Sequence, residues 1–455
     1  MRLASIGRIA LGVGLLLIVG GVAGLAAYAW RPPIGPVDPP AAASFDPALV
    51  RKGADLAAIG NCGTCHTAPG GQPFAGGLPL PTPFGTIHST NITPDPDTGI
   101  GRWSEAAFRR AMREGVDREG RHLYPAFPYD HFTLVTDEDN RALYAFLMTR
   151  RPVPARAPPN DLPFPLNLRV LLAGWKLLFL EEGPYQPDPA HDAVWNRGAY
   201  LTEGLAHCGA CHTPRNLLGA ERTDRRFAGG DSEGWHAVPI GSGSPAPVPW
   251  TEDSLFKYLR AGWHGLHGTA QGPMAPVADN LSMVPEEDVR AIAVYVAAVT
   301  GPPDAEARKR GEALAAAATP AGPGTRPQSA GSQTIAVAPA EQDPGAAIYA
   351  ATCASCHESG RASPFGGLDL RLSSAITADS PANLIRIIRH GVPARNGASA
   401  PIMPGFAAAL SDRQLTTLVD YLRGRFGNRP GWTGVEAAIR AAKDSEVAAS
   451  AAPNQ

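Results

Sequence analysis

The chain has 455 residues, a length that corresponds to about three domains. Charged residues make up 18% of the sequence and the net charge is −2, which argues against the basic face of a nucleic-acid-binding protein. The 6 cysteines are too few for a disulfide scaffold, and 50 glycines with 46 prolines predict a folded chain rich in turns.

The N-terminal segment predicts export. Residues 9–30 carry no charge and are flanked by arginines, and a helix of this length spans about 33 Å, enough for a bilayer core of about 30 Å. We therefore predict a membrane anchor within residues 1–31, favoured over a cleaved signal peptide, which the A-x-A sequence at 27–29 would also fit. The flanking charges predict an inner-membrane location with the body on the periplasmic side, beyond a Pro/Ala spacer at 32–43.

Three copies of one pattern, Cys-x-x-Cys-His, contain every cysteine of the chain. They lie at 62–66, 208–212 and 353–357, so successive copies begin 146 and 145 residues apart. This period is too long for a solenoid and predicts three related domains. Helical patterns surround each copy, so each domain is expected to run helix, CxxCH, long Gly/Pro loop, helix, loop, helix.

The middle helix of each domain has a recognisable beginning. Ser104 and Thr251 are expected N-caps in the first two domains. In the third, Ser380 is expected to cap a helix that has Pro381 at its first position. The fold class is therefore mainly α, with three tandem domains that each carry one CxxCH copy, long Gly/Pro loops and an N-terminal transmembrane helix.

Composition divides the chain further. Residues 302–343 contain no Phe, Tyr or Trp and predict a linker that tethers the third domain loosely. An apolar stretch at 166–180 is expected to be buried between the first two domains, in preference to docking on a membrane. The predicted segments are the anchor at 1–31, domain 1 at 45–152, a connector at 153–190, domain 2 at 191–301, the linker at 302–343, domain 3 at 344–426 and a tail at 427–455.

The motif CxxCH is typical of covalent haem c attachment. Two thiols add to the haem vinyl groups, and the adjacent histidine meets the iron. A zinc site would need further Cys or His pairs at close spacing, and each domain has no Cys beyond its own two. The sequence predicts three haems c, attached at Cys62, Cys65, Cys208, Cys211, Cys353 and Cys356, with His66, His212 and His357 as axial ligands.

The opposite axial ligand is commonly Met in electron-transfer cytochromes. Met274 and Met403 lie at matching points in Pro-rich loops before the last helix of domains 2 and 3, and we expect both to bind iron, with Met283 as a rival in domain 2.

The first domain has Phe127 at this point, and Phe cannot bind iron. The favoured substitute is His131, although an exposed loop imidazole is nearly as plausible for this residue. The alternatives are a five-coordinate iron, Met112, which is better explained as a core residue, and the histidines His88 and His122.

With these motifs, the chain resembles the membrane-bound triheme cytochrome c subunits of bacterial periplasmic dehydrogenases. The resemblance covers about residues 45–430 and includes the stretches STNITPDPDTGIG, LYPAFPYDHFT, AGWKLL and WNRGAYLTEGLAHCGACHTP. The family includes subunits of alcohol, gluconate and sugar dehydrogenases, and subunits paired with molybdenum hydroxylases for aldehydes or N-heterocycles. Phe127 stands where the alcohol-dehydrogenase branch generally has Met, which favours the hydroxylase-linked branch mildly.

The resemblance implies an electron relay without catalysis of its own. A periplasmic dehydrogenase subunit would pass electrons to the haems, and the haems would pass them to membrane quinone or a terminal acceptor. The alternative function is a peroxidase-type haem enzyme that uses an open iron site in the first domain.

Overall fold

The computed structural model describes residues 20–21, 24, 27–318, 343–359, 361, 366–394 and 400–451. They divide into two compact units. The first unit contains the chain up to Pro187 together with Glu203–His207, and the second contains Asp188–Thr202 and the chain from Cys208 onward. Most of the anchor predicted at 9–30 lies outside the described residues, and none of the described helices is long and apolar enough to cross a membrane.

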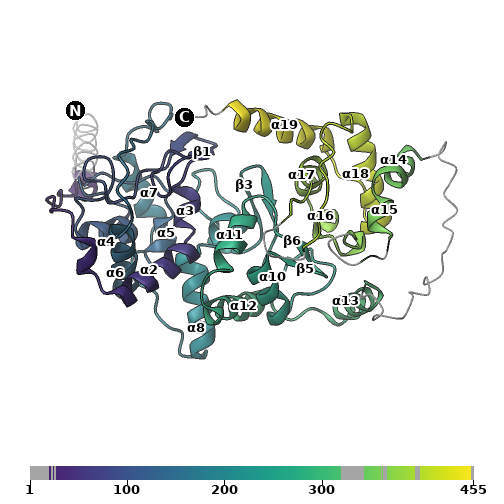
Figure 1. Cartoon of the computed structure of the whole chain (residues 1–455), viewed down its shortest axis with the longest axis horizontal. Coiled ribbons are helices and arrows are strands. Elements are labelled where there is room, and N and C mark those ends of the chain that lie inside the picture. The colour runs from purple at the N-terminus through teal and green to yellow at the C-terminus, as the bar shows by residue number, and fades with distance from the viewer. Residues whose placement is uncertain are drawn as a thin grey trace, which may run out of the picture. The chain divides into compact units, whose positions relative to one another are not determined.

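The first unit holds the first CxxCH copy among helices and one short hairpin (Figure 1). β1 and β2 pair antiparallel, with Pro79 opposite His88. The elements are η1 (Ala42–Ser44), α2 (Pro47–Ile59), α3 (Cys62–Cys65), β1 (Pro79–Thr82), β2 (Gly85–His88), α4 (Glu105–Glu114), α5 (Tyr129–Phe132), α6 (Asp137–Met148) and α7 (Leu171–Phe179).

The second CxxCH copy follows the same order, with an additional hairpin, and lies in the second unit except for Glu203–His207, which belong to the first. Its elements are α8 (Ala193–Ala199), the π-helical turn η2 (Tyr200–Leu205), α9 (Gly209–His212), η3 (Thr223–Arg225), β3 (Gly230–Ser232), β4 (Trp235–Ala237), α10 (Glu252–Ala261), β5 (Trp263–His264), β6 (Gly268–Thr269), α11 (Met274–Leu281) and α12 (Glu286–Thr300).

The third copy, also in the second unit, is helical in its described part. It contains α14 (Pro344–Thr352), α15 (Ala354–His357), η4 (Leu370–Leu372), α16 (Ser374–Thr377), α17 (Ala382–His390), α18 (Asp412–Gly427) and α19 (Val435–Ala451). The helix α19 falls in the predicted tail, yet Val435, Ile439 and Ala442 are buried in the same apolar core as α17 and α18.

In each copy the first and last helices cross in close contact, as α2 and α6 do in Figure 1. A glycine stands at each crossing because a side chain has no room there. A Cβ on Gly53 would lie 1.9 Å from the Ala142 carbonyl oxygen, and one on Gly198 would lie 2.0 Å from that of Ala291. Gly345 fills the same place in the third copy, where a Cβ would lie 2.5 Å from Cβ of Tyr421. The crossing confirms that the three copies share one helical framework.

The predicted caps are confirmed in the first two copies. The side chain of Ser104 accepts a hydrogen bond from the Ala107 amide, and Thr251 forms a capping box with Ser254. The third copy differs, because Pro381 is the N-cap residue and the helix begins at Ala382. Ser380 still accepts a hydrogen bond from the Ala382 amide, at 3.3 Å.

The linker prediction is wrong for residues 305–318, which form the helix α13 (Ala305–Ala318). Its Gly311 packs on Pro249 of the second copy, where a Cβ would lie 2.4 Å from the proline ring. Small residues with high helix propensity need no aromatic core when they pack on an existing domain. The loose tether is not observed either, because the second and third copies belong to one compact unit.

The spacer expected at 32–43 is bound to the first unit instead of being free. The Ile34 amide donates to the Arg118 carbonyl at 2.9 Å, and Arg110 donates to the Pro32 carbonyl at 2.7 Å. Just before the spacer, Nε2 of the buried His122 lies 2.9 Å from the Ala29 carbonyl. Prolines favour this extended binding because they leave few amides unsatisfied.

The apolar stretch at 166–180 is not buried as expected. It forms α7, in which Leu177 and Leu178 are 64% and 68% exposed. The opposite side of α7 carries the buried Lys176, whose Nζ donates to the carbonyls of Glu114 and Gly115 at 2.6 Å and to Nδ1 of His122 at 3.0 Å. The hydrogen bonds of Lys176 therefore hold α7 against the end of α4, and the leucines of α7 remain at the surface.

Candidate haem-attachment sites

Each CxxCH motif forms a tight helical turn. The histidine amide donates to the carbonyl of the first cysteine at 3.0 Å in all three copies, at His66, His212 and His357. In the first two copies the residue before the motif, Asn61 or His207, has a positive φ of 53° or 41°, which ends the preceding helix. This turn brings both cysteines and the histidine of each motif into one compact loop, as attachment at a single porphyrin edge requires.

The cysteines are suited to haem attachment better than to dithiol chemistry. Burial raises the pKa of Cys62 to about 12 and also raises the pKa values of Cys211 and Cys353. Redox-active CxxC pairs depend on a lowered thiol pKa, and the pKa values of these three thiols are shifted in the opposite direction.

The three motif histidines share one hydrogen bond that the sequence did not reveal. Nδ1 lies 2.6 Å from the Thr90 carbonyl for His66, 2.7 Å from the Val238 carbonyl for His212, and 2.7 Å from the Leu368 carbonyl for His357. A carbonyl oxygen only accepts, so Nδ1 carries the proton and Nε2 keeps its lone pair. This arrangement fixes the tautomer and ring orientation that metal-binding histidines need.

Electrostatics favour the same state. Desolvation lowers the pKa of His66 and that of His212, which keeps both imidazoles neutral near pH 7. A neutral ring with a protonated Nδ1 presents Nε2 as a ligand for iron. The donor set and its surroundings therefore fit a haem iron at each motif.

The two predicted methionine ligands occupy different backbone positions. Met274 begins α11, four residues after Ala270, whose amide donates to the Gly262 carbonyl at 2.8 Å. Met403 instead pairs directly with Val392 in an antiparallel bridge. The rival Met283 is 69% exposed, which disfavours it as a ligand.

The first unit repeats the arrangement around Met274. The Leu123 amide donates to the Gly115 carbonyl at 2.8 Å, and Phe127 follows Leu123 by four residues, as Met274 follows Ala270. The backbone register thus equates Phe127 with Met274, as the sequence spacing predicted. The Phe127 ring packs on Phe132, with ring centroids 5.2 Å apart.

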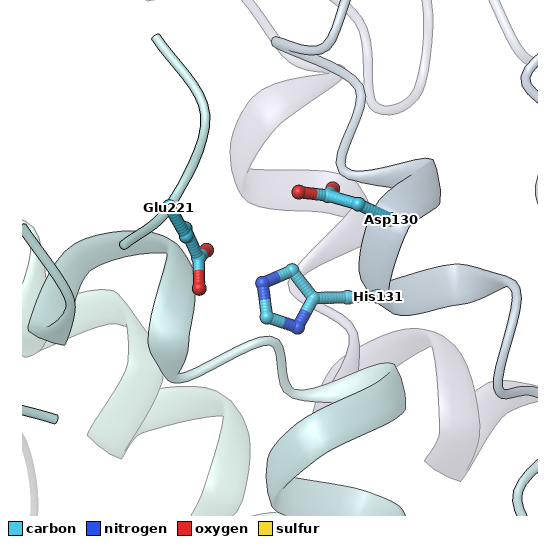
Figure 2. Close-up of side chains that lie close together, drawn as sticks. All are labelled: Asp130, His131 and Glu221. Carbon is cyan, nitrogen blue, oxygen red and sulfur yellow. The ribbon is translucent and has the colours of Figure 1, made fainter. Parts of the chain in front are cut away.

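His131 is buried, so the interpretation of this residue as an exposed loop imidazole is wrong. Figure 2 shows Asp130 and His131 projecting from α5; Glu221, also drawn there, belongs to the second unit. Nδ1 of His131 lies 2.6 Å from the Glu203 carbonyl, the same kind of contact that orients the motif histidines. Its ring also lies beside that of His207, with centroids 6.4 Å apart.

The remaining alternatives in the first unit differ in their surroundings. Both ring nitrogens of His122 are engaged, by Ala29 and Lys176, which leaves no nitrogen for iron. Met112 is 5% exposed within α4, in agreement with a core residue. His88 is half-buried on β2, and its Nδ1 has no hydrogen-bond partner within the described part of the chain.

The sequence matches two known families. Residues 50–151 match the family described as Cytochrome c, and residues 340–422 match the family described as Cytochrome C oxidase, cbb3-type, subunit III. These ranges contain the first and third CxxCH motifs.

Relatives extend over almost the whole chain. It is 45% identical over 424 residues to a nicotinate dehydrogenase subunit of Pseudomonas putida, and the match covers 92% of this chain and 34% of the relative. It is 37% identical to the fructose dehydrogenase cytochrome subunit of Gluconobacter japonicus, covering 88% of this chain and 84% of the relative. It is 38% identical to the gluconate 2-dehydrogenase cytochrome c subunit of Pantoea cypripedii, covering 84% of this chain and 86% of the relative. The chain thus spans about a third of the nicotinate dehydrogenase subunit and most of the other two.

Proposed function

Because the chain belongs to the family of cytochrome c subunits of bacterial dehydrogenases, we propose that it carries three haems c and relays electrons from an exported dehydrogenase to membrane quinone. Covalent attachment of haem c at the CxxC motifs and a role as an electron-transfer subunit follow from the family itself. The observation that supports three equivalent sites is the shared Nδ1–carbonyl hydrogen bond of His66, His212 and His357.

The bound haems supply one-electron redox chemistry, and the chain's residues set where and at what potential it occurs. Cys62, Cys65, Cys208, Cys211, Cys353 and Cys356 would hold the porphyrins. His66, His212 and His357 would bind the irons through Nε2, with each ring oriented by its carbonyl partner. Met274 and Met403 are the proposed opposite ligands, and a thioether there raises the potential of the iron.

We assign His131 as the proposed opposite ligand in the first unit. Its burial and its Nδ1 contact with the Glu203 carbonyl support this role. Replacement of His131 by Ala should then alter the spectrum of the first haem and allow carbon monoxide to bind it when reduced. The matched replacement of His88 by Ala should leave both unchanged. If the wild-type cytochrome already binds carbon monoxide and consumes peroxide, an open iron site and the peroxidase-type function would be supported instead.

The proposed partner is a periplasmic dehydrogenase subunit that hydroxylates an N-heterocycle such as nicotinate. This proposal rests on the similarity to the nicotinate dehydrogenase subunit and on Phe127 in place of Met. Hydroxylation with water releases two electrons and two protons per substrate, and three haems that each take one electron can accept both electrons. Alcohol and sugar dehydrogenases remain the other candidates among the relatives' partners.

The decisive experiment is purification of the native complex from membranes in mild detergent. We expect three haems per chain and a co-purifying catalytic subunit. The substrate of that subunit should reduce the haems in the complex but should not reduce those of the isolated cytochrome. Quinone added to the reduced complex should reoxidise the haems. A cytochrome that purifies without any dehydrogenase would contradict the proposed relay.

A further inference from the structure

The segments that hold two of the motif histidines meet the neighbouring copy within the second unit. Val238, whose carbonyl accepts from His212, directly follows β4 of the β3–β4 hairpin. Leu368, whose carbonyl accepts from His357, lies next to Gly268 of β6, where a Cβ would be 3.5 Å from the leucine side chain. The contact surface between the second and third copies therefore includes the segments whose carbonyls orient His212 and His357.

The β3–β4 hairpin is hydrogen-bonded to α17 of the third copy. The Asn383 side chain makes two hydrogen bonds to the backbone of one hairpin residue, His236: Oδ1 accepts from its amide at 2.9 Å, and Nδ2 donates to its carbonyl at 2.7 Å. A two-point contact of this kind fixes both the position and the orientation of the strand, as a paired β-strand would.

Two further hydrogen bonds lie near those of Asn383. Nε of the buried Arg386 donates to the Gly234 carbonyl at 2.7 Å, at the turn of the hairpin, and its guanidinium lies 5.9 Å from the centre of the Trp235 ring. Outside the hairpin, the Thr377 hydroxyl donates to the Pro245 carbonyl at 2.7 Å. The backbone of the second copy thus accepts from three separate side chains of the third.

The same helix leads to the proposed methionine ligand of the third copy. α17 ends at His390, and Val392 pairs with Met403, while the Phe406 amide donates to the Ile388 carbonyl at 2.9 Å. The hairpin therefore connects the carbonyl that orients His212 with the helix that positions Met403. Asn383 therefore sets the position of the hairpin relative to the helix that leads to Met403.

We propose that the β3–β4 hairpin and α17 form a fixed junction for electron transfer between the second and third haems, in which Asn383 is a positioning residue. This inference rests on the proposed function, because it needs haems at both motifs. Asn383 acts by holding His236 and, through β4, the segment that supports His212. Transfer between redox centres depends steeply on their distance and orientation, so a small displacement should slow it while leaving the potentials unchanged.

The test uses the full-length holo-cytochrome and flash photoreduction with less than one electron per chain. The phase that involves the third haem is identified as the one missing from a Cys353→Ala/Cys356→Ala chain. In Asn383→Ala, we expect this phase to slow by about tenfold or more, the size of effect that small losses of positioning produce. Haem content and the three midpoint potentials should not change, and the His236 amide should exchange hydrogen faster.

Matched variants separate positioning from general damage. Thr377→Val removes another donor across the same surface and should also slow the phase, to a smaller extent. Arg389→Gln alters the same helix but breaks an ion pair with Glu446 inside the third copy, so it should leave the rate unchanged. An unchanged rate in Asn383→Ala with faster exchange at His236, or an equal slowing in Arg389→Gln, would overturn the proposal. Absence of the third haem from the wild-type chain would instead refute the proposed function.

Discussion

A backbone carbonyl, which no sequence pattern marks, orients each motif histidine. The cysteines and histidines themselves could be predicted from the CxxCH spacing, because the chemistry requires those residue types in that order. Thr90, Val238 and Leu368 could not, since they contribute only main-chain oxygens and lie between 11 and 26 residues from their histidines. Likewise, the hydrogen bond that orients His131 comes from Glu203, 72 residues away in sequence.

The thioether ligands can be tested one at a time. Met274→Ala and Met403→Ala should each lower the midpoint potential of one haem, because a thioether favours ferrous iron. The expected decrease is roughly one to a few tenths of a volt, within the ~0.8 V range that axial ligands cover. Spectroelectrochemical titration of the purified cytochrome measures it. Met283→Ala is the control, and an unchanged potential in either test variant would refute that assignment.

Lys176 predicts a pH dependence of stability in the first unit. Burial lowers its pKa to about 7, although nearby carboxylates oppose the shift. The unfolded lysine keeps its proton up to its ordinary pKa near 10.5, so between these pH values the unfolded state binds more protons and the folded state gains stability as pH rises. The gain is at most about 3–5 kcal/mol, at roughly 1.4 kcal/mol per pKa unit.

Thermal unfolding followed by circular dichroism at pH 7 to 10 measures this dependence. In Lys176→Met the increase in folding stability with pH that Lys176 causes should disappear. The variant is less stable overall because two carbonyls lose their donor. A rise of equal size in the variant would show that Lys176 is not its source.

The helices are the elements that periodicity predicted best. The apolar spacing of residues 137–148 predicts a helix there, and the structure has one at Asp137–Met148, capped by Thr136. The short hairpins β1–β2, β3–β4 and β5–β6 were not predicted, since strands of two to four residues carry no readable alternation. The α7 surface also escaped prediction, because an apolar run alone does not show whether its leucines meet protein or solvent.

At this scale the helix crossing gives a sharp stability prediction. Gly53→Ala should destabilise the first unit by about 1–3 kcal/mol or more, because its Cβ would overlap the Ala142 carbonyl and force α2 away from α6. Gly174→Ala in α7 is the control in the same unit: among the described residues, a Cβ there would have no atom within 4 Å apart from its sequence neighbours and its own helix backbone, and alanine there should stabilise by up to about 1 kcal/mol. Chemical unfolding compares the two, and equal effects would contradict the crossing as the cause.

For the whole molecule, the three-fold repetition was readable because each copy carries its own CxxCH motif at a nearly constant spacing. The arrangement of the second and third copies was not, because it depends on single side chains such as Asn383 and on the unexpected helix α13. Composition marked 302–343 as lacking a core of its own but could not show that part of it packs on the second copy.

The predicted anchor can be tested at this scale. A chain that lacks residues 1–31 but retains a separate cleavable export signal should still acquire haems and should move from the membrane to the soluble periplasmic fraction. Haem staining of fractionated cells measures this redistribution. Retention of the shortened chain on membranes would contradict an anchor confined to these residues and would direct attention to the exposed leucines of α7.

The binding of residues 29–37 to the first unit has a consequence for how such a cytochrome would search for its redox partners. Ala29, Pro32, Ile34 and Val37 are each held by a hydrogen bond to the unit. A free spacer would act as a leash, letting the haem domain sweep a volume that grows with its length. A bound segment is rigid: with the predicted anchor ahead of Ala29 in the bilayer, the first haem would keep a constant distance from the lipid, and encounters would depend on diffusion in two dimensions.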